Sequence, residues 1–122
     1  MLDSAGHLAQ AERIEAFLKT LRDGSSPYRE WVVIAWFYSA LHSVEAFLVT
    51  KSAVYRNHDL RRAAMRRHEE TRAILADYQQ LHEAAGEARY EGTPFIERNL
   101  TEIEPVFLRV RAAMRQALGP AP

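Results

Sequence analysis

The most apolar part of the chain lies between Trp31 and Val49, and its hydrophobic side chains cover nearly the whole circumference of a helix. One helical stripe consists of Trp31, Ile34, Tyr38 and Val49, and a second consists of Val33, Phe37, Ala40, Val44 and Phe47. A helix that is apolar on almost every side is typical of the centre of a fold. We therefore predict a central buried helix over about residues 27–50, with Ser26 as its N-cap and Pro27 at its first helical position.

Elsewhere in the chain, apolar residues recur at steps of three and four, which predicts amphipathic helices around this centre. These helices cover about residues 4–21, 57–85 and 101–118. Thr101 and Glu104 have the spacing of a capping box at the start of the last one. The segment 87–91 is expected to form a loop or a short helix. The sequence therefore predicts one all-α domain over residues 1–122, a compact bundle of four or five helices.

The remaining face of the central helix carries small side chains instead of large apolar ones. Its residues are Ser39, Ser43, Ala46 and Thr50. Small side chains allow another helix, or a second copy of the same helix, to approach closely. This pattern leaves two interpretations open, a homodimer seam and a solvent-exposed face.

The composition is that of a globular protein without a net charge. Hydrophobic residues make up 48% of the chain, and 16 basic residues balance 16 acidic ones, so no global field draws the chain to nucleic acid or to a membrane. The chain has no cysteine, and its first residues lack the features of a secretory signal. His42 and Glu45 argue against a membrane span in the central helix. We therefore predict a cytoplasmic protein with no membrane association.

The sharpest polar feature is the set Tyr38, His42 and Glu45, whose spacing puts all three on one face of the central helix. A carboxylate and an imidazole removed from water need partners from another helix. The best candidates for these partners are His58, Arg61, Arg89 and Tyr90. Three interpretations are open: a polar network that holds the bundle in register, a functional pocket, and a metal site. The additional Glu residues that a di-iron bundle needs are not found, so no metal and no cofactor are predicted.

A basic segment follows the central helix. Residues 56–72 contain six arginines and two histidines against three acidic residues, a local charge that could neutralise phosphates. On a helical wheel, however, these arginines scatter around the axis. Arg66 and Arg67 also lie three or four residues from Glu69 and Glu70, which is the spacing of surface ion pairs. A solvated face is therefore favoured over a nucleic-acid patch.

Several short pieces of the chain, in their order and spacing, resemble bacterial members of the HEPN superfamily. These pieces are WVVIAWFYSALHSVEAFL at residues 31–48, HDLR at 58–61, YQQL at 78–81 and EARY at 87–90. The resemblance implies a small helical bundle that forms homodimers and associates with RNA or nucleotides. Many HEPN domains are metal-independent ribonucleases of defence or toxin–antitoxin systems, and others are non-catalytic.

Active HEPN domains carry an Arg and a His separated by four to six residues, in which Arg stabilises charge on the phosphorane and His moves the proton of the attacking hydroxyl. Arg61 and Arg62 stand at this spacing before His68, and Arg61 is expected to share a helical face with His68. The pair lies earlier in the chain than is usual for the family, and no histidine follows Arg98. We therefore expect a non-catalytic binding module. A ribonuclease using Arg61, Arg62 and His68 is the second hypothesis, and a scaffold partnering a protein such as a nucleotidyltransferase is the third.

Overall fold

The computed structural model describes residues 2–22, 28–51, 57–91 and 97–120. These residues form six α-helices and one π-helical turn, with no strand among them. The elements are α1 (Ser4–Arg22), α2 (Arg29–Thr50), α3 (His58–Arg67), α4 (Glu69–Arg72), α5 (Leu75–Gly86), η1 (Glu87–Glu91) and α6 (Glu97–Leu118). The predicted all-α bundle is confirmed. The predicted caps of the central helix, Ser26 and Pro27, lie outside the described residues.

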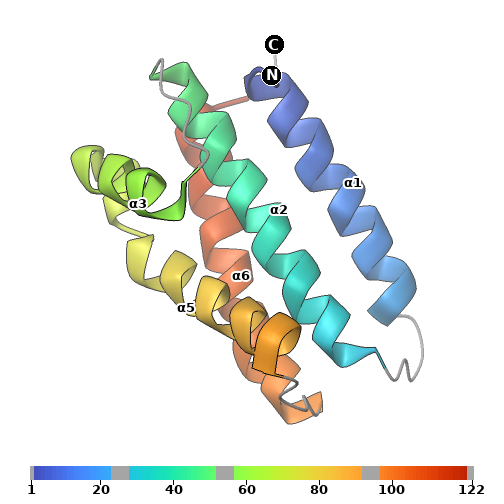
Figure 1. Ribbon diagram of the computed structural model, residues 1–122. Helices are drawn as coiled ribbons and strands as arrows, with labels where there is room; N and C mark the ends of the chain where they lie inside the picture. Colours follow the sequence, from blue (N-terminus) through green and yellow to red (C-terminus); the bar gives the residue numbers. More distant parts are fainter. Residues whose placement is uncertain (1, 23–27, 52–56, 92–96, 121–122) are drawn as a thin grey trace.

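Helix α2 is the centre of the fold, as its apolar circumference predicts. Figure 1 shows it between α1 on one side and α3 and α5 on the other, with α6 behind it. Phe37, Val44 and Leu48 are completely buried. By length and composition α2 could span a membrane, but 78% of its most apolar window is buried within the described part of the chain. This burial is typical of a core helix packed on all sides.

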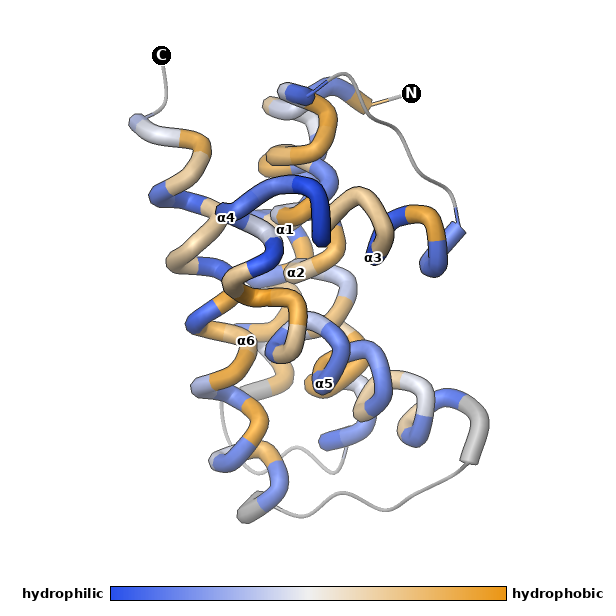
Figure 2. The backbone as a smooth tube through the Cα atoms, turned by 90° about the vertical axis from the view of Figure 1, so that its left-hand side faces the viewer, coloured by the Kyte–Doolittle hydropathy of each residue, from blue (hydrophilic) through white to orange (hydrophobic). Residues whose placement is uncertain are grey.

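The predicted single helix over residues 57–85 is wrong, because the chain changes direction twice within it. Asn57 caps α3 by accepting hydrogen bonds at Oδ1 from the backbone N–H groups of Asp59 and Leu60. At His68 the backbone is extended, with φ −120° and ψ 130°. The Thr71 hydroxyl then donates to the Met65 carbonyl at 2.7 Å. These breaks divide the segment into α3, α4 and α5 (Figure 2), and they allow buried residues of both α3 and α5 to join one core.

The small-residue face of α2 is buried except at its end, where Thr50 is exposed, so the buried part is neither a dimer seam nor a solvent-exposed face. Ser39 and Ala46 are completely buried, and Ser43 is 1% exposed. The Ser4 hydroxyl at the start of α1 donates to the Ala46 carbonyl at 2.8 Å. The small side chains therefore serve the close approach of a helix of the same chain.

The last helix starts earlier than predicted. Helix α6 begins at Glu97, so Thr101 and Glu104 lie inside it and do not form a capping box. Pro105 also lies within the helix, on its exposed side. The apolar stripe of α6 continues past it through Val106, Val110 and Met114, all of which are buried. Packing of this stripe against the core explains why the helix persists through a proline.

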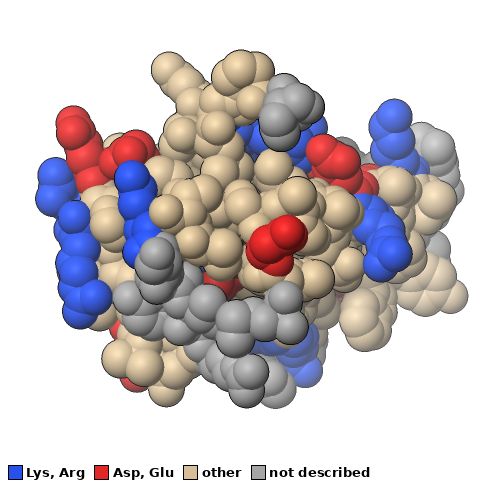
Figure 3. Space-filling view, turned by 90° about the horizontal axis from the view of Figure 1, so that it is seen from above, with Lys and Arg blue, Asp and Glu red and all other residues tan. Residues whose placement is uncertain are grey.

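Only part of the basic segment is solvated, because Arg61 is buried and Arg62 is half-buried. Arg66 and Arg67 at the end of α3 are exposed, as is Arg72 of α4. In Figure 3, basic side chains on the left-hand side of the molecule lie next to acidic ones. The expected pairing of Arg66 and Arg67 with Glu69 and Glu70 is absent from the described contacts, because the helix breaks at His68 between them.

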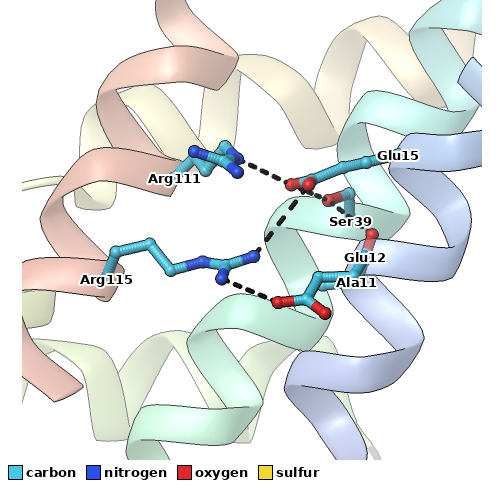
Figure 4. A network of polar contacts seen from close by, with 6 residues as sticks. All are labelled: Ala11, Glu12, Glu15, Ser39, Arg111 and Arg115. Carbon is cyan, nitrogen blue, oxygen red and sulfur yellow. Dashed lines mark hydrogen bonds and ion pairs between the residues drawn. The ribbon is translucent and has the colours of Figure 1, made fainter. Parts of the chain in front are cut away.

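A polar network joins α1 to α6 (Figure 4). Arg111 Nε donates to Glu15 Oε1 at 2.9 Å, and Arg115 Nη1 donates to Glu12 Oε1 at 3.0 Å. The Ser39 hydroxyl of α2 lies 3.2 Å from the same Glu15 oxygen. These contacts fix α1 over α2 and α6 on the side of the bundle away from the candidate site described next.

Candidate functional site

Tyr38, His42 and Glu45 of α2 each contact a different neighbouring element. Tyr38 contacts η1, His42 contacts α1 and Glu45 contacts α3. Glu45 is the most buried of the three, and Arg61 Nε of α3 donates a hydrogen bond to its Oε1. The two side chains are only 5% and 6% exposed. This contact between Glu45 and Arg61 was expected from the sequence, and it gives the buried carboxylate the partner that it needs.

Two imidazole rings lie next to this ion pair. His58 of α3 and His82 of α5 have ring centroids 4.3 Å apart. The buried ring of Phe37 stacks on His82 at 5.0 Å and contacts His58 at 6.0 Å. Phe37, a buried core residue, therefore contacts both imidazole rings.

Each imidazole accepts a hydrogen bond from an arginine. Arg61 Nη1 lies 2.9 Å from His58 Nδ1, and Arg62 Nη1 lies 3.4 Å from His82 Nδ1. Because a guanidinium only donates, each Nδ1 must be the acceptor, so the proton of each neutral ring is on Nε2. Both histidines can therefore offer an Nε2–H donor to a ligand.

Arg89 of η1 completes the site. Its Nη1 donates to the Tyr38 hydroxyl, and its guanidinium lies over the Tyr38 ring with Cζ 5.4 Å from the centroid. We call His58, Arg61, Arg62, His82 and Arg89 the arginine–histidine cluster. Tyr90, the other predicted member from this turn, follows Arg89 in η1, but its side chain lies outside the described part of the structure.

The electrostatics of the cluster keep its imidazoles neutral. Burial lowers the pKa of His58, and the neighbouring His82 and the arginines lower it further. Burial likewise lowers the pKa of His82, and the positive charges of Arg62, Arg89 and Arg61 add to this effect. A histidine whose pKa lies below its ordinary value of 6.5 is largely uncharged at neutral pH.

The cluster brings three guanidinium groups together with two imidazoles. Among the described contacts, Arg61 donates to Glu45 and Arg62 donates to Asp59. The charge of Glu83 also acts on His82. The Asp59 side chain is 82% exposed, whereas that of Arg62 is 24% exposed. Neighbouring guanidinium and imidazole N–H groups are suited to the oxygens of a phosphate.

His42 belongs to a different pair. Its Nδ1 lies 3.0 Å from Nδ1 of His7 on α1. Burial lowers the pKa of both rings, in His7 against the opposing charge of Glu45. Sequence reasoning missed His7 and His82. The only available signal was spacing, because His82 follows the core residue Tyr78 by four positions and His7 precedes Ile14 by seven.

The structure places His68 apart from the arginines with which it was expected to act. His68 follows α3 with an extended backbone, and its ring packs edge-on against Phe47 at 5.9 Å. The prediction that His68 shares a helical face with Arg61 is therefore wrong. Arg61 and Arg62 lie instead beside His58 and His82.

Among the described residues, no group of three or more His, Asp and Glu side chains is arranged to hold a metal ion. Comparisons with models of protein families, with curated proteins and with solved structures found no match. The resemblance to the HEPN superfamily therefore stays a prediction that depends on the residues themselves.

Proposed function

We propose that this chain is a HEPN-like binding module that holds a phosphate group of RNA or of a nucleotide at the arginine–histidine cluster. The observation that supports this proposal is the arrangement of His58 and His82, whose rings lie 4.3 Å apart with an arginine on each Nδ1. This arrangement leaves two Nε2–H donors beside three guanidinium groups. Convergent donors of this kind bind a phosphate more tightly than one cation on an exposed surface does.

The geometry favours binding over cleavage. Hydrolysis of RNA by its own 2′-hydroxyl needs a general base with a free lone pair near that hydroxyl. Each imidazole of the cluster uses its only lone pair, on Nδ1, to accept a hydrogen bond from an arginine. His58 and His82 can therefore donate to a phosphate, but neither has a free lone pair with which to take a proton.

The proposed site predicts a small and local salt dependence. Because the chain has no net charge, only the phosphates bound by the cluster should release counterions. For a single strand, the slope of log K against log salt is about −0.7 for each neutralised phosphate. A substitution that removes one phosphate contact should therefore reduce the slope by about 0.7.

The test compares Arg62→Ala and Arg89→Ala with Arg66→Ala, measured by fluorescence anisotropy with a labelled single-stranded RNA at several salt concentrations in EDTA. Arg66 is the matched control, because it lies on α3 like Arg62 but is exposed and outside the cluster. Loss of a charged hydrogen bond should weaken binding about tenfold, and Arg66→Ala should change it little. Equal losses in all three variants, or no binding by the wild type, would contradict the proposal.

The resemblance to HEPN domains also leads us to propose a homodimer in solution and, as a protein partner, a nucleotidyltransferase. Light scattering over a concentration series tests the dimer directly. The buried small-residue face under α1 is not available for this contact. If the protein binds no RNA and no nucleotide, a scaffold is the remaining proposal, and co-purification with a nucleotidyltransferase tests it.

A further inference from the structure

An apolar groove runs between α1 and α2, next to the arginine–histidine cluster. It has a volume of about 350 Å³. Its walls include Ile14 and Phe17 from α1, and Trp31, Ile34 and Tyr38 from α2. These positions repeat at helical spacing along the two facing helices, so the groove follows the contact between them.

Two aromatic side chains of the groove are unusually exposed. Phe17 is 51% exposed and Trp31 is 52% exposed. The other large apolar residues of α1 and α2 are buried or half-buried, whereas Phe17 and Trp31 are exposed and line the same groove. Clustered aromatic surface that the fold leaves in water is typical of a binding site.

The groove is continuous with the cluster through Tyr38. The ring of Tyr38 lines the groove, while its hydroxyl accepts a hydrogen bond from Arg89. The buried ring of Phe37 lies 5.4 Å from the Tyr38 ring and also contacts the rings of His58 and His82, at 6.0 and 5.0 Å. The aromatic groove therefore lies next to the N–H groups that we propose bind phosphate.

We propose that this groove holds an unpaired base of a single-stranded RNA, stacked against Trp31 and Phe17, while the adjacent phosphate binds the arginine–histidine cluster. This inference rests on the proposed function. A nucleotide combines a flat apolar face with a nearby anion, and the groove and the cluster offer the complementary surfaces in the same order. A purely apolar occupant would leave the cationic end without a counterpart, and the bases of a duplex are not accessible for stacking.

Polar groups at the groove are suited to the edges of a base. Gln10 and His42 line it together with the aromatic residues. An amide offers both donors and an acceptor, which allows hydrogen bonds to any base edge. The groove should therefore accept different bases, with affinity set mainly by stacking strength.

The fluorescence of Trp31 tests this inference. The chain has two tryptophans, and Trp36 is buried against Phe107, so the variant Trp36→Phe leaves Trp31 as the only reporter. This variant is titrated with single-stranded RNA, with duplex RNA and with inorganic polyphosphate. Single-stranded RNA should quench the fluorescence in a saturable way. Polyphosphate should bind through Arg62 without quenching, and the duplex should not quench either.

Affinity provides a second readout that does not depend on the Trp36 variant. Trp31→Ala and Phe17→Ala should each weaken binding of single-stranded RNA about tenfold. They should leave polyphosphate binding unchanged. Leu108→Ala is the matched control, because Leu108 is a similarly exposed apolar residue at 49% but lies on α6, outside the groove.

The outcomes separate this inference from the proposed function. RNA binding that needs Arg62, with unchanged Trp31 fluorescence and unchanged affinity in Trp31→Ala and Phe17→Ala, would overturn the base site and leave the phosphate site standing. If Trp31→Ala dissociates a dimer without changing RNA affinity, the groove binds a second copy of the chain and the inference is wrong. No binding of RNA or polyphosphate would overturn both proposals.

Discussion

Arg61 on α3 donates a hydrogen bond to Glu45 on α2, and water is almost completely excluded from both side chains. A second nitrogen of the same guanidinium holds His58 at 2.9 Å. Arg61 therefore connects the core to the candidate site. Its removal would disturb folding and ligand binding together, so the tests of function above use Arg62 and Arg89.

The first prediction concerns this ion pair. Glu45→Ala and Arg61→Ala should each lower the free energy of unfolding by about 3–5 kcal/mol, because either change leaves an uncompensated buried charge. The double variant Glu45→Ala/Arg61→Ala removes both charges and should cost less than the sum of the single changes. Urea denaturation of the four proteins measures the difference. Additive losses would show that the two side chains do not depend on each other.

The second prediction concerns pH. Burial lowers the pKa of His7, His42, His58 and His82 below the ordinary value of 6.5. As the pH falls below 6.5, the unfolded chain takes up these protons before the folded chain does. The free energy of unfolding should therefore fall over this range, and the contribution of these groups is complete only above 6.5.

Denaturation at a series of pH values on both sides of 6.5 measures this effect. The double variant His7→Gln/His42→Gln removes two of the four groups, so its stability should decline less steeply toward acidic pH. The pair is also expected to separate on protonation, because two charged rings would meet where the Nδ1 atoms now lie 3.0 Å apart. An unchanged slope in the double variant would contradict the role given to these two rings.

The third prediction concerns the small-residue face of α2. Ser39 is completely buried against α1, with its hydroxyl near Glu15 and the Ala11 carbonyl. Ser39→Leu should lower the free energy of unfolding by about 1–3 kcal/mol, because the larger side chain forces α1 away. Thr50→Leu is the control, since Thr50 belongs to the same face but is exposed at its end. A change in oligomeric state without loss of stability would instead support the interpretation of this face as a dimer seam.

Much of the fold could be predicted from the sequence because α2 is apolar on almost every side. The same reasoning placed Tyr38, His42 and Glu45 on one face, and it named Arg61 and Arg89, which the structure brings to Glu45 and Tyr38. Buried polar groups need partners, so this part of the candidate site followed from the composition of one helix.

The rest could not be predicted, because it depends on tertiary packing. The residues around His68 are ordinary helix formers, and no glycine or proline there predicts the extended backbone. The chain breaks there and again before α5, and His82 of α5 lies beside His58 of α3. Hydrophobic periodicity shows that α2 is buried on several faces. It does not show which neighbouring helix covers each of these faces. For this reason α1 was not recognised as the cover of Ser39 and Ser43.

The last prediction separates the site expected from the sequence from the site in the structure. His68 packs against Phe47 away from Arg61, whereas His82 lies beside Arg62 and His58. His82→Ala should therefore weaken RNA binding about tenfold through loss of a phosphate donor, and His68→Ala should leave the affinity unchanged. Anisotropy titrations in EDTA measure both variants, and gel analysis of the same samples detects cleavage. If RNA is cleaved in EDTA and the cleavage disappears in His68→Ala, the ribonuclease hypothesis is correct, because His68 then acts in catalysis even though it lies outside the arginine–histidine cluster.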